Sequence, residues 1–201
     1  PQRPAGTSAP WDVVVVGGGH AGCEAALAAA RLGCRTLLVT QRRDRLAAMP
    51  CNPSVGGLAK SHLVAELDAL GGEMARNSDF TGIQFRTLNA SRGPAVRARR
   101  VQCDKECYSL RMQAVAAGRE GLTLIEDECT AILLDGARAA GIAAARHGEI
   151  AARRVIVTSG TALAGRIHIG TEVVPGGGGD RPAADALATS LRQAGFELRR
   201  L

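Results

Sequence analysis

The sequence predicts an α/β fold: a doubly wound, Rossmann-like dinucleotide-binding domain. Three observations predict the β-α-β core of this fold. An unbroken run of valines at residues 13–16 is typical of a parallel strand buried on both faces. A glycine-rich turn follows it directly, and the Ala- and Leu-rich segment over residues 20–32 is typical of a helix ending at a glycine. A second apolar run, residues 35–40, completes a unit of about 30 residues.

Further elements are predicted in order along the chain. Residues 41–57 contain two prolines and have no regular period, which indicates a long functional loop. Helices are predicted at residues 58–70 and 101–117, with a polar connection over residues 79–98 between them. Asp135-Gly136 lies between two apolar runs and predicts a hairpin. The remaining predicted elements are strands at residues 122–126, 129–134, 139–146 and 155–158 and a helix at residues 182–193.

Composition places the chain among globular proteins. It has 201 residues, of which 46% are apolar and 22% are charged. No uncharged apolar run approaches the roughly 20 residues that cross a bilayer, so no membrane span is expected. The formal net charge of +6 is carried mainly by arginine. Such a charge favours an anionic partner, either a phosphate-bearing cofactor or a nucleic acid.

The domain prediction separates a disordered tail, residues 1–10, from a single domain over residues 11–201. The tail contains Arg, Ser, Thr and Pro but no acid, so the remnant of an organelle transit peptide is an alternative. Six cysteines are spread along an α/β-type chain, which favours reduced thiols over a disulfide framework. No His or second Cys pair follows at zinc-site spacing, and no metal site is expected.

The strongest candidate site is the glycine-rich turn that opens the first helix. Gly17, Gly19 and Gly22 fit the pattern G-x-G-x-x-G directly after a buried strand. The first glycine permits a tight turn, the second lets a pyrophosphate approach the backbone, and the third lets helix and strand pack closely. The alternative is a glycine-rich turn that binds no ligand. The predicted cofactor-binding residues here are Gly17, Gly18, Gly19, His20, Ala21 and Gly22.

The glycine pattern alone does not decide between NAD and FAD. The second strand ends in Thr40-Gln41, without the acid that normally binds the ribose hydroxyls. Gln41 could hydrogen-bond a ribose, and Asp44 is the nearest carboxylate in the sequence. Residues 154–161 form an apolar strand closing on a small-residue turn, as in two-dinucleotide-fold flavoproteins, and this favours FAD.

An ordered series of motifs resembles the MnmG (GidA) family. The motifs are GGGHAGCEAA at residues 17–26, MPCNPSVGG at 49–57, DALGG at 68–72, GPAVRA at 93–98 and GRIHIG at 165–170. The resemblance runs from about Trp11 to the end of the chain and covers about the first third of such a protein. It implies a doubly wound, Rossmann-like FAD-binding domain of the two-dinucleotide-fold type that is incomplete at its C-terminus. It implies an FAD-dependent enzyme that, with the GTPase MnmE, installs the 5-carboxymethylaminomethyl group on the wobble uridine of certain tRNAs.

The same resemblance implies the other participants. NADH would be the reductant, bound outside this chain, and methylenetetrahydrofolate would be the one-carbon donor. The full-length protein would be a homodimer in the cytoplasm or, alternatively, in a mitochondrion. This fragment alone is expected to be inactive. The closest rival is the folate- and FAD-dependent tRNA methyltransferase TrmFO, and a rival of another class is a non-catalytic module that binds nucleotide or RNA.

Site residues follow from the resemblance one by one. It assigns residues 17–22 to the FAD pyrophosphate and the backbone of Cys129 to the adenine. It places Ala183 where the family usually has a cofactor-contacting serine, so only a backbone contact is expected there. Residues 175–180 lack the arginine that usually interrupts the family's glycines.

Cys51 is the predicted catalytic residue. Carbon 5 of uracil is a poor nucleophile until a thiolate adds at carbon 6, and a loop cysteine near cationic side chains can supply that thiolate. The alternative is a small residue filling a Gly- and Pro-rich loop.

A cluster of arginines without neighbouring aromatics suits contact with tRNA phosphates more than base recognition. The alternatives are a basic surface or salt bridges between domains. The cluster begins at Arg86, and the predicted nucleic-acid-binding residues in it are Arg92, Arg97, Arg99 and Arg100.

Overall fold

The computed structural model describes residues 9–49, 52–178 and 181–199. Four parallel strands form a sheet in the order β10-β1-β2-β6, which confirms the predicted α/β class. Strand β1 has β2 on one side and β10 on the other, so the strand order reverses beside β1. Such a switch point leaves a crevice at the carboxyl ends of the strands. The strands are β1 Val13–Val16, β2 Thr36–Thr40, β6 Leu122–Glu126 and β10 Val155–Val157.

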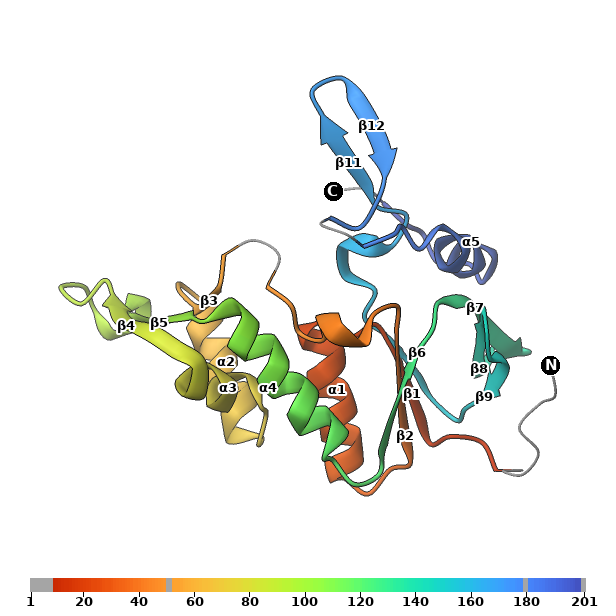
Figure 1. The fold of residues 1–201 in the computed structure, drawn as a ribbon, viewed down its shortest axis with the longest axis horizontal. Coiled ribbons are helices and arrows are strands. Elements are labelled where there is room, and N and C mark those ends of the chain that lie inside the picture. The colour runs from red at the N-terminus through yellow and green to blue at the C-terminus, as the bar shows by residue number, and fades with distance from the viewer. Residues whose placement is uncertain (1–8, 50–51, 179–180, 200–201) are drawn as a thin grey trace.

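Helices cover one face of the parallel sheet. Helices α1 (His20–Arg31) and α4 (Lys105–Ala117) lie together on that side in Figure 1. Val15 of β1 and Leu38 of β2 are completely buried in the same apolar cluster as Leu27 of α1. This cluster packs α1 against the parallel sheet.

A second, antiparallel sheet and helix α5 pack on the other face (Figure 1). Val14 and Val16 of β1 are buried there in one cluster with Ile142 and Leu187. Alternate residues of β1 are therefore buried on opposite faces, as its valine run predicts. The elements of this layer are β7 Cys129–Asp135, β8 Arg138–Ala144, β9 Gly148–Ala151 and α5 Asp185–Gln193.

The hairpin predicted at Asp135-Gly136 is confirmed. Asp135 pairs with Arg138 across the turn, and Gly136 has a φ of +59°. A glycine adopts this left-handed conformation without the steric cost that a side chain would bring. The helix predicted over residues 58–70 is also present, as α2 (Lys60–Ala69).

The middle of the chain differs from the prediction. The helix expected over residues 101–117 begins only at Lys105, because Asp104 accepts hydrogen bonds from the backbone N–H groups of Glu106 (3.0 Å) and Cys107 (2.9 Å) and so caps it. The connection expected over residues 79–98 is instead largely regular structure. It holds the end of α3 (Met74–Thr81), the strand β4 (Gly82–Leu88) and the short 3-10 helix η2 (Pro94–Val96), and β5 (Ala98–Cys103) begins at its last residue.

Strands β4 and β5 belong to a three-stranded antiparallel sheet in the order β3-β5-β4, with β3 at Ser54–Gly56. A further unpredicted hairpin pairs β11 (Arg166–Ile169) with β12 (Glu172–Pro175) and projects from the molecule in Figure 1. Helix α5 starts three residues later than expected, at Asp185 instead of residue 182. Most of the predicted tail, and residues 50 and 51, lie outside the described residues.

A buried carboxylate ties α1 to α3. Glu24 is only 9% exposed. Its oxygens accept hydrogen bonds from the backbone N–H groups of Glu73 (3.0 Å) and Met74 (2.6 Å), at the N-terminus of α3. The Glu73 side chain in turn pairs with Arg111 of α4 at 2.6 Å. Negative charge at a helix N-terminus is favourable, so Glu24 both satisfies two N–H groups and complements the helix dipole.

We therefore expect Glu24→Ala to lower the free energy of unfolding by about 2–3 kcal/mol, because it leaves two buried donors without an acceptor. Glu24→Gln keeps one acceptor oxygen and should lose about half as much. Denaturant unfolding followed by circular dichroism measures both. The exposed Glu66 of α2 provides the control, since Glu66→Ala should cost no more than about 0.5 kcal/mol. Equal losses at Glu24 and Glu66 would contradict the capping role.

Candidate dinucleotide site

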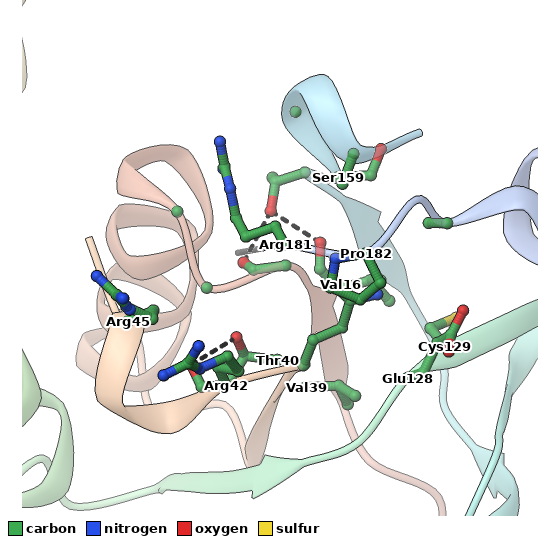
Figure 2. Close-up of a pocket in the computed structure, with 18 of the residues that line it drawn as sticks. Val16, Val39, Thr40, Arg42, Arg45, Glu128, Cys129, Ser159, Arg181 and Pro182 are labelled. Carbon is green, nitrogen blue, oxygen red and sulfur yellow. Dashed lines mark hydrogen bonds between the residues drawn. The ribbon is translucent and has the colours of Figure 1, made fainter. Parts of the chain in front are cut away.

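A cavity of about 410 Å³ opens at the carboxyl ends of β1 and β2 (Figure 2). Its wall is built from the glycine turn, the loop after β2, the β6–β7 connection, the turn after β10 and the segment leading into α5, together with Lys105 at the start of α4. This position is the switch point of the parallel sheet, where α/β folds bind their ligands. The volume falls within the range of about 300–1,000 Å³ that is usual for ligand sites.

Three glycines of the turn are required by the protein's own packing. Gly17 has a φ of +106°, and a Cβ there would lie 2.5 Å from the carbonyl oxygen of Thr158. A Cβ at Gly18 would lie 2.5 Å from a methyl carbon of Leu46. A Cβ at Gly22 would overlap the carbonyl oxygen of Gly17. These close approaches hold the turn tightly between the sheet and α1.

Gly19 is different, because a Cβ built there has no heavy atom within 4 Å. It lines the cavity at the N-cap position of α1. The first intrahelical bond runs from the N–H of Cys23 to the carbonyl of Gly19 at 2.9 Å. The N–H groups of residues 20–22 precede that bond, and such groups at a helix start bind anions. The open space at Gly19 therefore fits a phosphate group.

Thr158, just beyond β10, is hydrogen-bonded to the start of the glycine turn. Its hydroxyl lies 2.8 Å from the carbonyl oxygen of Val16 and 3.0 Å from that of Gly17, and its backbone N–H donates to Val16 at 2.8 Å. The segment predicted over residues 154–161 is thereby placed directly beside the glycine turn. This contact joins parts of the chain that are far apart in the sequence.

Arginines surround the side of the cavity next to the glycine turn. Arg42 binds Asp44 through two hydrogen bonds, of 3.0 and 2.6 Å, and the Arg42 side chain holds the pKa of the Asp44 carboxyl below its usual value. The guanidinium of Arg181 donates to the carbonyl oxygens of Gly177 (2.8 Å) and Gly178 (3.0 Å). Figure 2 shows Arg42 and Arg45 across the cavity from Glu128 and Cys129. Asp44 balances the charge of Arg42, whereas Arg181 donates to neutral oxygens within the described residues, so Arg181 is a cation available to an anion.

Carboxylates line the side of the cavity formed by the β6–β7 connection. The N–H of Asp127 donates to the carbonyl of Thr40 at 2.8 Å, so this connection lies beside the end of β2. Burial alone would raise the pKa of the Asp127 carboxyl. The carboxyl is hydrogen-bonded to the His147 ring and accepts hydrogen bonds from the backbone N–H groups of Glu128, His147 and Arg146, and together these bonds hold its pKa below the usual value. The Asp127 carboxylate is therefore occupied by hydrogen bonds within the protein.

Glu128 supplies the carboxylate that the end of β2 lacks. It lines the cavity, as does Gln41, and no described side chain pairs with its carboxylate. Carboxylate and amide oxygens at this position can accept hydrogen bonds from ribose hydroxyls. Glu128 was not predicted from the sequence because the acid is expected directly after the second strand, whereas the sheet brings it in from another segment.

The predicted cofactor-binding residues are distributed unevenly around the cavity. Gly17, Gly18, Gly19 and Cys129 line it. Burial raises the pKa of the Cys129 thiol to about 12, so this residue offers backbone groups and not a thiolate. Gly22, His20 and Ala21 are not among the described lining residues, and neither is Ala183, although the residues on both sides of it are.

The ring of His20 packs toward the helical layer. Its centroid lies 5.6 Å from that of Tyr108 on α4, and burial lowers the pKa of His20. Cys51 lies outside the described residues, whereas Met49, two positions earlier, lines the cavity.

The predicted nucleic-acid-binding arginines lie away from this cavity. They belong to the β4–β5 hairpin, which extends to the left in Figure 1, away from the parallel sheet. Arg97 donates to the carbonyl of Arg92 at 3.0 Å within the connecting loop. Arg99 and Arg100 are consecutive on β5 and so point to opposite faces of the sheet. The structure therefore does not gather the four into a single patch.

Three negative observations apply to the described ranges, residues 9–49, 52–178 and 181–199. No group of three or more His, Cys, Asp or Glu side chains within them is placed to hold a metal ion. The cysteines described there are free thiols. None of the helices there is both long enough and apolar enough to span a bilayer.

Comparisons with known proteins agree with this geometry. The family model "Glucose inhibited division protein A" (GIDA) matches residues 12–201. The tRNA uridine 5-carboxymethylaminomethyl modification enzyme MnmG of Pelobacter propionicus is 54% identical over 192 residues, which are 95% of this chain and 30% of that protein. The protein of the same name from Streptococcus sanguinis is 50% identical over 94% of this chain and 30% of its own length. The chain thus spans about a third of these relatives.

Solved structures give the same result. Aquifex aeolicus GidA in its form II crystal superposes with a TM-score of 0.89 at 42% identity, covering 94% of this chain and 31% of that one. A GidA-related protein from Thermus thermophilus superposes with a TM-score of 0.69 at 21% identity, covering 94% of this chain and 70% of that one. At 21% identity, the similarity to the Thermus thermophilus protein shows only a shared fold.

Proposed function

The chain belongs to the glucose-inhibited division protein A (GidA) family, and on that premise we propose that it is the N-terminal, FAD-binding part of a tRNA-modifying enzyme. The enzyme would add the 5-carboxymethylaminomethyl group to the wobble uridine of tRNA, as the names of its MnmG relatives describe. The activity belongs to the whole protein, because this chain spans 30% of those relatives. The observation that carries the proposal is Gly19, an open position in an otherwise tightly packed glycine turn.

Different residues of the cavity would bind different parts of the proposed cofactor. The backbone of residues 17–19 and the start of α1 would hold the pyrophosphate, with Arg181 balancing its charge. Gln41 and Glu128 would accept hydrogen bonds from the adenosine ribose, and the backbone of Cys129 would meet the adenine. When bound, FAD would supply redox chemistry between NADH and the one-carbon unit of methylenetetrahydrofolate.

The remaining participants are proposed for the full-length protein. NADH, the GTPase MnmE and a second copy of the protein would bind mainly through parts beyond this chain, and methylenetetrahydrofolate would be the one-carbon donor. The cytoplasm is the compartment we propose, with a mitochondrion as the alternative. The TrmFO-type methyltransferase remains the second candidate for the reaction. The high identity to proteins named MnmG favours the carboxymethylaminomethyl reaction over it.

The test begins with the purified full-length protein. We expect flavin absorption bands and, after release, a cofactor with the mass of FAD. Nucleosides from tRNA of a strain lacking the protein should lose the carboxymethylaminomethyl group at the wobble uridine. A colourless protein that takes up no added FAD would contradict the proposal and leave the non-catalytic module as the better account.

A further inference from the structure

Two arginines face each other on the β4–β5 hairpin. The antiparallel register places Arg86 directly opposite Arg100, and the same register places Gln84 opposite Gln102. Residues two apart on a strand share a face, so all four side chains lie on one side of the hairpin. Like charges directly opposite each other destabilise a sheet, so this arrangement is unfavourable unless an anion compensates it.

The described part of the protein provides no such anion. Neither Arg86 nor Arg100 forms an ion pair within it. Arg100 donates instead to the hydroxyl of Ser54 at 3.2 Å, and that hydroxyl donates to the side-chain oxygen of Gln102 at 2.8 Å. The chain of hydrogen bonds orients the Arg100 guanidinium from β3 without neutralising it. Arg86 is exposed.

The four polar side chains line a hollow of about 130 Å³, together with Leu88. None of these residues lines the dinucleotide cavity. The hollow is well below the roughly 300 Å³ at which small-molecule sites begin. This size suits a single phosphate group better than a base or a whole nucleotide.

We propose that this hollow is a phosphate site in which one phosphate group of an RNA backbone bridges Arg86 and Arg100. Guanidinium groups match phosphate oxygens in a two-pronged geometry, and Gln84 and Gln102 add amide donors at the rim. The hairpin extends away from the parallel sheet (Figure 1), and Arg86 on this face is exposed, so the face is accessible to a large partner. That the RNA is tRNA rests on the proposed function.

The first test is tRNA binding by the full-length, FAD-loaded protein. Arg86→Gln and Arg100→Gln should each weaken binding about tenfold and reduce the slope of log affinity against log salt by about one. Because both guanidinium groups hold the same phosphate, the double variant should lose little more than either single variant. Independent surface charges would give additive losses instead, and additive losses would overturn the shared site. The control is Arg138→Gln at the β7–β8 turn, which should change the affinity less than twofold.

The second test uses inorganic phosphate as the probe. At equal ionic strength, phosphate should raise the Tm of the FAD-loaded wild-type protein, whose dinucleotide site is filled, above its value in chloride, and neither FAD-loaded arginine variant should respond. The variants should fold normally, because each relieves a like-charge pair. An unchanged phosphate response in both variants would overturn the site.

The two tests together separate the possible failures. Loss of the phosphate response with unchanged tRNA affinity would overturn RNA as the ligand and assign the hollow to a free phosphate compound. A wild-type protein that binds no tRNA, but whose phosphate response depends on Arg86, would contradict the proposed function while supporting the phosphate site.

Discussion

Replacing Gly19 by aspartate is expected to abolish FAD retention while leaving the fold intact. The protein itself accepts a side chain at this position, since a Cβ meets no heavy atom within 4 Å and the φ of −73° is ordinary for any residue. Aspartate is also among the best N-cap residues, so α1 should be at least as stable. The new carboxylate would nevertheless occupy the place proposed for the pyrophosphate and repel it. We expect the Kd for FAD to rise at least about 100-fold, which corresponds to about 2.7 kcal/mol.

Two measurements on the full-length variant check this expectation. Titration of the apoprotein with FAD gives the Kd, and thermal unfolding without FAD reports the fold. Gly93→Asp is a matched control, because Gly93 also has a negative φ (−63°) and no atom within 4 Å of its Cβ but lies on the β4–β5 loop. It should bind FAD normally. Undiminished FAD in the Gly19 variant would overturn the assignment of the site.

The contrast between Gly19 and its neighbours shows what sequence could and could not predict. The pattern of glycines after a valine run correctly predicted the turn, because a parallel strand buried on both faces has no polar interruption. It also assigned Gly17 and Gly22 to a tight turn and to close packing and Gly19 to the approach of a pyrophosphate, and the space around the three glycines agrees with that division. It could not tell which residue lies against Gly17 and Gly22, because Thr158 follows a distant strand, β10.

The antiparallel sheet of the hairpin was missed for a related reason. Strand β4 has mostly exposed residues, and its sequence alternates polar and apolar side chains without a buried face. Such alternation is itself a strand signal, but the polar, glycine- and arginine-bearing composition of residues 79–98 favoured a connection instead. The boundary at Asp104 did carry a signal, since an aspartate before an amphipathic run is a common helix cap. The expected helix ran past it because residues 101–103 continue the apolar pattern.

The charged wall of the cavity was beyond the reach of sequence patterns. Arg42, Arg181 and Glu128 lie on irregular segments, and only the tertiary fold brings them to one cavity. For Cys51 the situation is reversed, because the prediction that it is catalytic rests on the sequence motif around it. Its neighbours are tied to the structure: Met49 lines the cavity, and the carbonyl of Pro53 accepts a hydrogen bond from the N–H of Cys103 at 2.7 Å.

Replacing Cys51 by serine is expected to abolish tRNA modification while leaving FAD bound. The proposed thiolate forms a bond to carbon 6 of uracil, and the electron pair of the 5,6 double bond moves toward the carbonyl oxygen at carbon 4, which makes carbon 5 nucleophilic. After carbon 5 has reacted, loss of its proton restores the double bond and expels the thiolate. A serine hydroxyl is not ionised near neutral pH and cannot take this part, so the rate should fall at least about 1,000-fold.

Cys107→Ser is the matched control. Cys107 is an exposed cysteine of α4, and its hydrogen bond with Asp104 raises its thiol pKa, so it stays protonated and should be dispensable. Mass analysis of wobble nucleosides measures the modification, and absorption measures FAD. A tRNA carrying 5-fluorouridine, whose fluorine cannot leave as a proton does, should form a stable covalent complex with the wild type and not with Cys51→Ser. Unchanged modification by that variant would leave Cys51 as a small residue that fills its loop.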